Sequence, residues 1–277
     1  MSAALVLAAA AVASPAFWSA WGDGKAELSR YVLTTPRYGA PREAELVLIY
    51  VTEPVDRRVW IKDDAGDVPA AERLQVLKLN RVVKFRTGIY PYSVMTSVFA
   101  PVDGAAHERF SPSKISFTAQ EWCGHVWQKL LPGPGRFDLE VRSYFHADGE
   151  RNVTVMVPEN TLYEDALLIQ LRELDGPFAA GGDWSGTMVP TLWAARTGHA
   201  APAASPATIK RADARRDGAP VTRFTVTVAG RTTTYDVERA APRRVLGWRS
   251  SDGEVAGLVK TARLPYWELN KPGDSPF

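Results

Sequence analysis

Two strand-like runs between Phe85 and Leu131 constrain the fold of this chain more than any other feature. In the first run, residues 88–102, large side chains occupy both the even and the odd positions, so neither face of a strand would be plainly polar. A sheet with one face in contact with solvent carries polar side chains on that face, so large apolar side chains are not expected on both. The run therefore predicts a strand that is covered on both sides or that lines a cavity.

The second run begins with clean alternation, in which apolar side chains such as Ile115 and Phe117 alternate with polar ones. Beyond residue 120 the pattern has two interpretations. A bulge at Gly124 would change the phase of the strand. If the pleat instead continues, three chemically active groups share one face: Glu121, Cys123 and His125.

Short apolar or alternating runs separated by turn residues continue along the rest of the chain. The alternation is clearest in residues 136–146, and Asp148-Gly149 is typical of the turn that would join this strand to 152–157 as a hairpin. The other strands are expected over 28–34, 45–52, 59–62, 74–86, 207–212, 221–228, 232–238, 245–248 and 255–261.

One helix is expected at about 160–174. Thr161 and Glu164 have the spacing of a capping box, apolar residues recur at helical spacing, and Asp175-Gly176-Pro177 is a stop signal. Strands, one helix and then more strands predict a mainly antiparallel β protein. We expect a curved sheet or half-open barrel with this one covering helix.

The N-terminal residues 1–13 are apolar and uncharged and end in Ala-Val-Ala, as in a secretory signal peptide. The positive start of such a peptide is missing, so a frayed Ala-rich terminus is the alternative. The leader predicts a periplasmic or secreted protein. Residues 14–277 are expected to form a single large β-rich domain, or two sub-lobes joined around 175–206, with no transmembrane span.

Charge and composition exclude some functions. The net charge is +2, with 33 basic and 31 acidic residues spread along the chain, which argues against a nucleic-acid partner. The single cysteine forms no internal disulfide. No phosphate loop, nucleophile elbow or zinc motif is present, so no cofactor and no metal are predicted.

Cys123 and His125, with Glu121 as a third member, form the one cluster that could carry catalysis. Side chains two apart on a strand could bind one metal or share a proton. A metal would need a further ligand, for which His107 and His146 are the imidazole options. The alternative is structural, because free cysteine is among the most buried residue types.

An aromatic set near the same residues could line an apolar ligand pocket. Its alternative is an ordinary aromatic β core. The predicted ligand-binding residues are Tyr90, Tyr92, Met95, Trp122 and Trp127.

Four segments carry a resemblance to known proteins: KLNRVVKFRTGIYPYSVMTSVF, FTAQEWCGHVWQKL, EDALLIQLREL and VLGWRSSDGEVAGLVKTARLPYWELN. They are similar to uncharacterised bacterial envelope proteins, which are secreted or lipid-anchored β-rich domains of unknown function, some with septum-related names. By analogy these lie near the half-barrels of lipoprotein carriers such as LolA and LolB. The resemblance implies location and architecture, not an activity. The leader lacks the cysteine of lipid-anchored members.

The sequence therefore predicts a non-enzymatic periplasmic or secreted β-protein that binds an apolar or amphipathic envelope ligand, with a lipid or a lipoprotein as partner. Two alternatives stay open. One is a metal- or thiol-dependent hydrolase centred on Glu121, Cys123 and His125, and the other is an envelope scaffold or assembly partner. The oligomeric state is left open.

Overall fold

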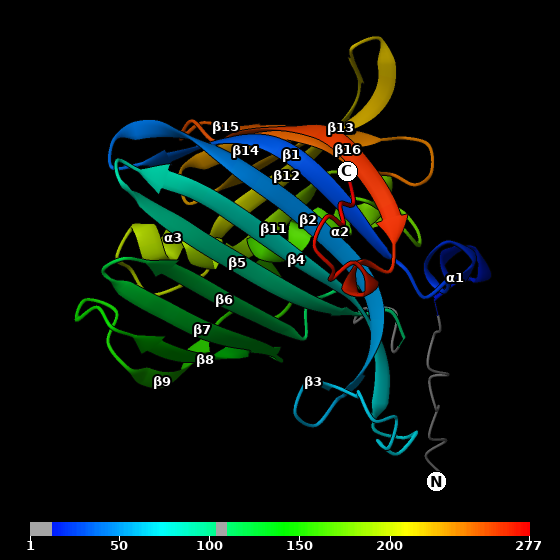
Figure 1. The fold of residues 1–277 in the computed structure, drawn as a ribbon, viewed down its shortest axis with the longest axis horizontal. Coiled ribbons are helices and arrows are strands. Elements are labelled where there is room, and N and C mark those ends of the chain that lie inside the picture. Colours follow the sequence, from blue (N-terminus) through cyan, green and yellow to red (C-terminus); the bar gives the residue numbers. More distant parts are fainter. Residues whose placement is uncertain (1–12, 104–109) are drawn as a thin grey trace, which may run out of the picture.

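The computed structural model describes residues 13–103 and 110–277, and within them a single curved sheet of 16 strands forms the body of the protein (Figure 1). The strands are β1 (Ala26–Arg37), β2 (Ala40–Asp56), β3 (Ile61–Lys62), β4 (Arg73–Thr87), β5 (Tyr90–Pro101), β6 (Lys114–Glu121), β7 (Gly124–Gly133), β8 (Arg136–Ser143), β9 (Arg151–Met156), β10 (Leu162–Tyr163), β11 (Trp184–Val189), β12 (Ser205–Arg216), β13 (Ala219–Val228), β14 (Arg231–Glu238), β15 (Val245–Ser250) and β16 (Val255–Leu264).

The order of the strands makes the sheet almost a barrel. It runs β10-β11-β12-β13-β14-β15-β16-β1-β2-β4-β5-β6-β7-β8-β9, with β3 paired to β2. All pairs are antiparallel except β10 with β11. The two edge strands, β9 and β10, follow one another in the chain, and the rings of Phe137 on β8 and Tyr163 on β10 approach to 6.2 Å. A ring contact therefore bridges the two edges of the sheet, which no strand pairing joins in the described residues, and the predicted half-open antiparallel barrel is confirmed.

Alternation along each strand separates the inside of the barrel from the outside. On β4, Val83 and Phe85 are buried, whereas Lys84 and Arg86, which alternate with them, are exposed. β5 repeats the pattern with Tyr92 and its even-numbered neighbours inside. Its outer face is partly covered at Phe99, because Lys114 of β6 lies over the Phe99 ring and its ammonium group donates to the carbonyl of Trp60, just before β3, at 2.7 Å. This cover accounts for the bulk on both faces of β5.

The chain reverses between β6 and β7, so the continued pleat considered for this run is wrong. Glu121 pairs with Gly124, and Trp122 and Cys123 form the two-residue turn between them. Gly124 has a φ of 154°, and a Cβ there would lie 2.7 Å from a ring carbon of Tyr144. The close approach of this ring excludes a side chain at residue 124.

The helices are short. They are α1 (Pro15–Trp21), η1 (Glu164–Ala166), α2 (Leu167–Gln170), η2 (Phe178–Gly181), α3 (Leu192–Thr197) and η3 (Tyr266–Glu268), where η denotes a 3₁₀ turn. η3 packs on the outer face of β1 and β2 through Tyr266. Within residues 13–103 and 110–277, none is long and apolar enough to cross a membrane. The segment 175–206, predicted as a crossover or joint, contributes β11 to the sheet.

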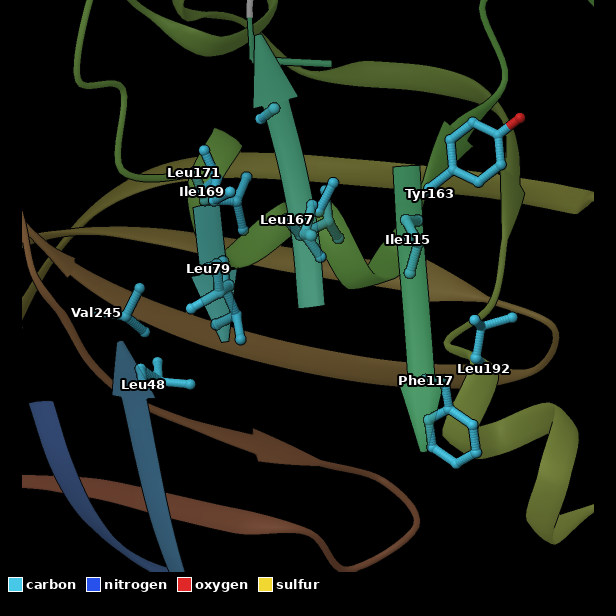
Figure 2. Close-up of a cluster of buried hydrophobic side chains, with 14 of the residues drawn as sticks. Leu48, Leu79, Ile115, Phe117, Tyr163, Leu167, Ile169, Leu171, Leu192 and Val245 are labelled. Atoms are coloured by element: carbon cyan, nitrogen blue, oxygen red, sulfur yellow. The ribbon is translucent and has the colours of Figure 1, made fainter. Parts of the chain in front are cut away.

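The helix expected at about 160–174 is shorter, and it lies inside the barrel (Figure 2). The capping box does not form, since the hydroxyl of Thr161 donates to the carbonyl of Pro158 and the carboxylate of Glu164 pairs with Arg231. Leu167, Leu168 and Ile169 of α2 are all buried, and a helix that is apolar on most sides is stable only when surrounded by other apolar groups. The hydroxyl of Tyr50 on β2 donates to the carbonyl of Leu168 at 2.9 Å and fixes the helix to the wall.

A buried ion pair anchors the chain just after α2. The guanidinium of Arg172 donates to both carboxylate oxygens of Glu27 on β1, at 2.8 and 2.9 Å, and to the carbonyls of Pro242 and Arg243. Arg172 is 0% exposed and lies over the ring of Tyr50. The pair joins the interior segment to β1 and to the β14–β15 turn, so it holds three parts of the barrel in register.

The two ends of the barrel differ. The turns β1–β2, β4–β5, β6–β7, β13–β14 and β15–β16 lie at the end that also holds α3, which we call the α3 end. α1 and β3 lie toward the opposite end (Figure 1). Residues 1–12 of the predicted leader lie outside the described residues, and Ala13 is buried.

Candidate binding cavity

A cavity of about 400 Å³ lies inside the barrel at the α3 end. Its apolar lining comes from strand, helix and wall positions: Leu79, Val98, Leu168 and Trp193. Its charged lining consists of Arg81, Glu164, Asp165, Arg231, Asp252 and Glu254. The cavity is therefore amphipathic, because both charged and apolar side chains line it.

Glu254, which precedes β16, forms an ion pair with Arg81, the first of two basic groups in the lining. Its carboxylate lies 3.2 Å from the guanidinium of Arg81 and accepts the indole N–H of Trp248 at 2.8 Å. The hydroxyl of Thr35 donates to its other oxygen at 3.3 Å. These bonds satisfy a carboxylate that faces the interior.

Arg231 at the start of β14 is the second basic group. It forms an ion pair with Glu164 of η1, and its Nε lies 3.8 Å from the carboxylate of Asp252. The backbone N–H of Thr191 donates to Glu164 at 3.1 Å, which ties the start of α3 to η1. Burial raises the pKa of Glu164, and the charge of Arg231 opposes that shift.

Asp165 has the least support of the four carboxyl groups. Its Oδ2 accepts the backbone N–H of Leu192 at 2.9 Å, and no ion pair to it is found in the described part of the chain. Burial, with a smaller contribution from the charge of Glu164, raises its pKa from the usual 3.8 to about 7. This carboxyl can therefore gain or lose a proton near neutral pH.

α3 closes this end of the barrel. Two backbone N–H groups at its start donate to Glu164 and Asp165, and its Arg196 guanidinium lies 3.5 Å from Asp148 and over the ring of Phe145. Trp193 lines the cavity from the helix. The helix thus separates the cavity from the β8–β9 loop.

Three of the predicted ligand-binding residues meet at the rim of the same end. The ring of Tyr90 lies 5.9 Å from that of Tyr92 and 6.2 Å from that of Trp122. Tyr92 stacks on Phe85 at 4.7 Å, and Phe85 in turn contacts Trp193. The rim cluster is therefore continuous with the cavity wall through Trp193.

The other two predicted residues do not join this cluster. Met95 and Trp127 lie on the outer face, in register with Thr118, and the ring of Trp127 contacts the ammonium of Lys129. A wide depression of about 1440 Å³ also lies beside Tyr92 and Trp122, with Glu45 and Lys84 in its lining. Because this depression is more open to solvent, the smaller cavity inside the barrel is the better candidate for a binding site.

The structure brings Glu121 and Cys123 together but not His125. The carboxylate of Glu121 accepts the backbone N–H of Cys123 at 2.6 Å, and it raises the pKa of the Cys123 thiol by hydrogen bonding and by its charge. His125 pairs with Gln120 and is exposed on the outer face. A raised thiol pKa lowers nucleophilicity at neutral pH. The geometry gives the thiol hydrolase no support.

The described residues contain no group of three or more His, Cys, Asp and Glu side chains that could hold a metal ion. Of the two further imidazoles considered as ligands, His107 lies outside the described residues, and His146 is in the loop after β8.

Sequence reasoning missed the charged side of the cavity, although one signal was present. Arg81 occupies the same alternating positions as Leu77, Leu79, Val83 and Phe85, all of which face inward. A charge at such a position indicates a polar interior site. Glu164 and Asp165 were interpreted instead as acids of a helix N-terminus.

Comparison with known proteins supports the fold and nothing finer. No family model matches the chain, and no curated protein matches it. A solved structure, the β-barrel-like protein of domain of unknown function DUF1849 from Brucella abortus, is similar over 87% of this chain and 98% of that one, with a TM-score of 0.50 and 11% identity. The chain thus shares a β-barrel-like fold with a domain of unknown function. The LolA and LolB analogy and the envelope location stay predictions.

Proposed function

We propose that this protein is a non-enzymatic binding protein that holds a small amphipathic ligand in the cavity at the α3 end. The observation that carries the proposal is the cavity of about 400 Å³, which is lined both by apolar side chains such as Leu79, Val98 and Leu168 and by charged groups. Ligand sites in proteins have volumes of roughly 300–1,000 Å³ and combine an apolar wall with few polar groups.

Exposed apolar side chains at the same end support a lipid-like ligand or partner. The turns at this end carry Tyr38, Ile89, Trp122 and Tyr144, which are 61, 72, 68 and 76% exposed. Apolar side chains gathered on one part of a surface are typical of contact with a membrane or a partner. A periplasmic or secreted location is proposed from the leader in residues 1–13.

Filling the cavity tests this proposal. We expect Ala194→Phe to weaken binding of eight-carbon probes (octanol, octanoate and octylamine) by about tenfold or more, because Ala194 lines the cavity and the added ring would occupy its volume. Isothermal titration calorimetry measures the affinities.

Ala195→Phe is the matched control. Ala195 is the next residue of α3, and it is not part of the lining, so this variant should bind the probes like the unmodified protein. Absence of binding to all three probes, or equal loss in both variants, would contradict a ligand site in the cavity.

A further inference from the structure

We infer that the cavity selects ligands that carry a cationic amine, and that Asp165 is the counter-ion of that amine. The inference rests on the proposed function and names the class of ligand. It follows from the balance of charges in the cavity and from the bonding of one carboxyl group.

The cavity lining carries more carboxyl groups than guanidinium groups. Four carboxyl groups, Glu164, Asp165, Asp252 and Glu254, face two guanidinium groups, Arg81 and Arg231. Both guanidinium groups already have carboxylate partners: Arg81 pairs with Glu254, and Arg231 pairs with Glu164 and Asp252. A ligand with a positive group would therefore complement the site, whereas a ligand with a carboxylate would meet a surplus of negative charge.

Of the four carboxyl groups, Asp165 is the one that forms no ion pair in the described part of the chain. Its one hydrogen bond in the described part of the chain comes from the backbone N–H of Leu192, to Oδ2. Oδ1 has no donor there, although the side chain lines the cavity. An ionised carboxylate in an enclosed site is stable only with several donors or a counter-ion. An ammonium group has three N–H donors and a full charge, and it would supply both.

The remaining wall fits the rest of such a molecule. Leu79, Val98, Leu168 and Trp193 line the cavity and offer an apolar surface for a hydrocarbon chain. A primary alkyl amine combines one cationic end with one apolar end. This is the simplest ligand class that complements both the carboxyl groups and the apolar side chains of the lining.

Binding of an amine should also change the protonation of Asp165. The charged groups around this carboxyl are Glu164 on η1, Arg81 on β4 and Arg231 on β14, with Asp252 and Glu254 in the same lining. Burial holds the pKa of Asp165 at about 7 without ligand, and an adjacent ammonium would lower it. Amine affinity should therefore rise as the pH increases from 6 to 8. At the higher pH a smaller fraction of Asp165 is protonated and must lose its proton when the amine binds.

The test compares octylamine, octanol and octanoate by calorimetry at pH 8, where the amine is charged. We expect octylamine to bind at least about tenfold more tightly than octanol, and octanoate to bind most weakly. Asp165→Asn should abolish the preference for the amine and leave octanol affinity within about twofold. Asp213→Asn is the control, because it removes the same charge at a residue that is 73% exposed and lies outside the lining, and it should retain the preference.

The other outcomes would contradict the inference alone or the inference together with the proposed function. Equal affinity for octylamine and octanol, or an amine preference that survives in Asp165→Asn, would overturn the inference and leave the proposed function in place. If none of the three probes binds, the proposed function and the inference both fail. Amine affinity that is flat between pH 6 and 8 would exclude Asp165 as the counter-ion.

Discussion

Replacement of Arg172 by leucine is expected to lower the free energy of unfolding by about 3–5 kcal/mol, because the carboxylate of Glu27 would then be buried without a cation. Glu27 and Arg172 are 3 and 0% exposed, so water cannot replace the lost partner. Two backbone carbonyls in the β14–β15 turn, those of Pro242 and Arg243, would also lose their donors. Urea unfolding followed by circular dichroism measures the change.

A double variant separates loss of the ion pair from loss of packing. Glu27→Leu with Arg172→Leu removes both charges, and we expect it to regain much of the stability lost in the single variant. Arg58→Leu is the surface control: its ion pair with Asp56 spans 2.6 Å, but the Arg58 side chain is 56% exposed, and the loss should be below about 1 kcal/mol. If Arg172→Leu unfolds at the same urea concentration as Arg58→Leu, the buried pair has no structural role.

Asp165→Asn is expected to stabilise the protein at pH 8 by about 4 kcal/mol and to have little effect at pH 4. The pKa of this carboxyl is about 7 in the folded protein, against 3.8 when it is unperturbed. Between these values the folded state binds more protons than the unfolded state, so stability falls as the pH rises. Asparagine stays neutral, and its carbonyl can still accept the N–H of Leu192.

Urea unfolding at pH 4, 6 and 8 checks this result. The difference between Asp165→Asn and the unmodified protein should grow steadily across the series. Thr118→Ser serves as control, because this exposed residue carries no ionisable group and its difference from the parent should stay within about 0.5 kcal/mol at all three pH values. A constant difference between the Asp165 variant and the parent at all three pH values would show that the carboxyl does not titrate in this window.

Much of the fold follows from local patterns. Alternation in β4 assigned Leu77, Leu79, Val83 and Phe85 to one face, and all four are buried. The hairpin of β8 and β9 was also predicted, and Arg136 pairs with Met156 as this hairpin requires. These features depend on neighbours within one or two strands, and side-chain periodicity carries that information.

Local patterns failed where the outcome depended on distant groups. The alternating run through residues 114–131 gave no sign of the reversal at Trp122 and Cys123, which the approach of Tyr144 to Gly124 accompanies. The acids at the start of the expected helix were assigned to a cap. In the structure they face Arg231 and the start of α3, contacts that lie 67 and 27 residues away.

By itself, the sequence determined which segments become strands, which faces of those strands are apolar and that the sheet must enclose something, because these properties depend on alternation within each run. Only the tertiary structure decided that Arg81, Asp165, Arg231 and Glu254 share one cavity. They belong to segments that meet only when the sheet curls, as the 173-residue separation of Arg81 and Glu254 shows. Alternation records whether a side chain points inward, but the order and register of the strands determine which inward side chains meet.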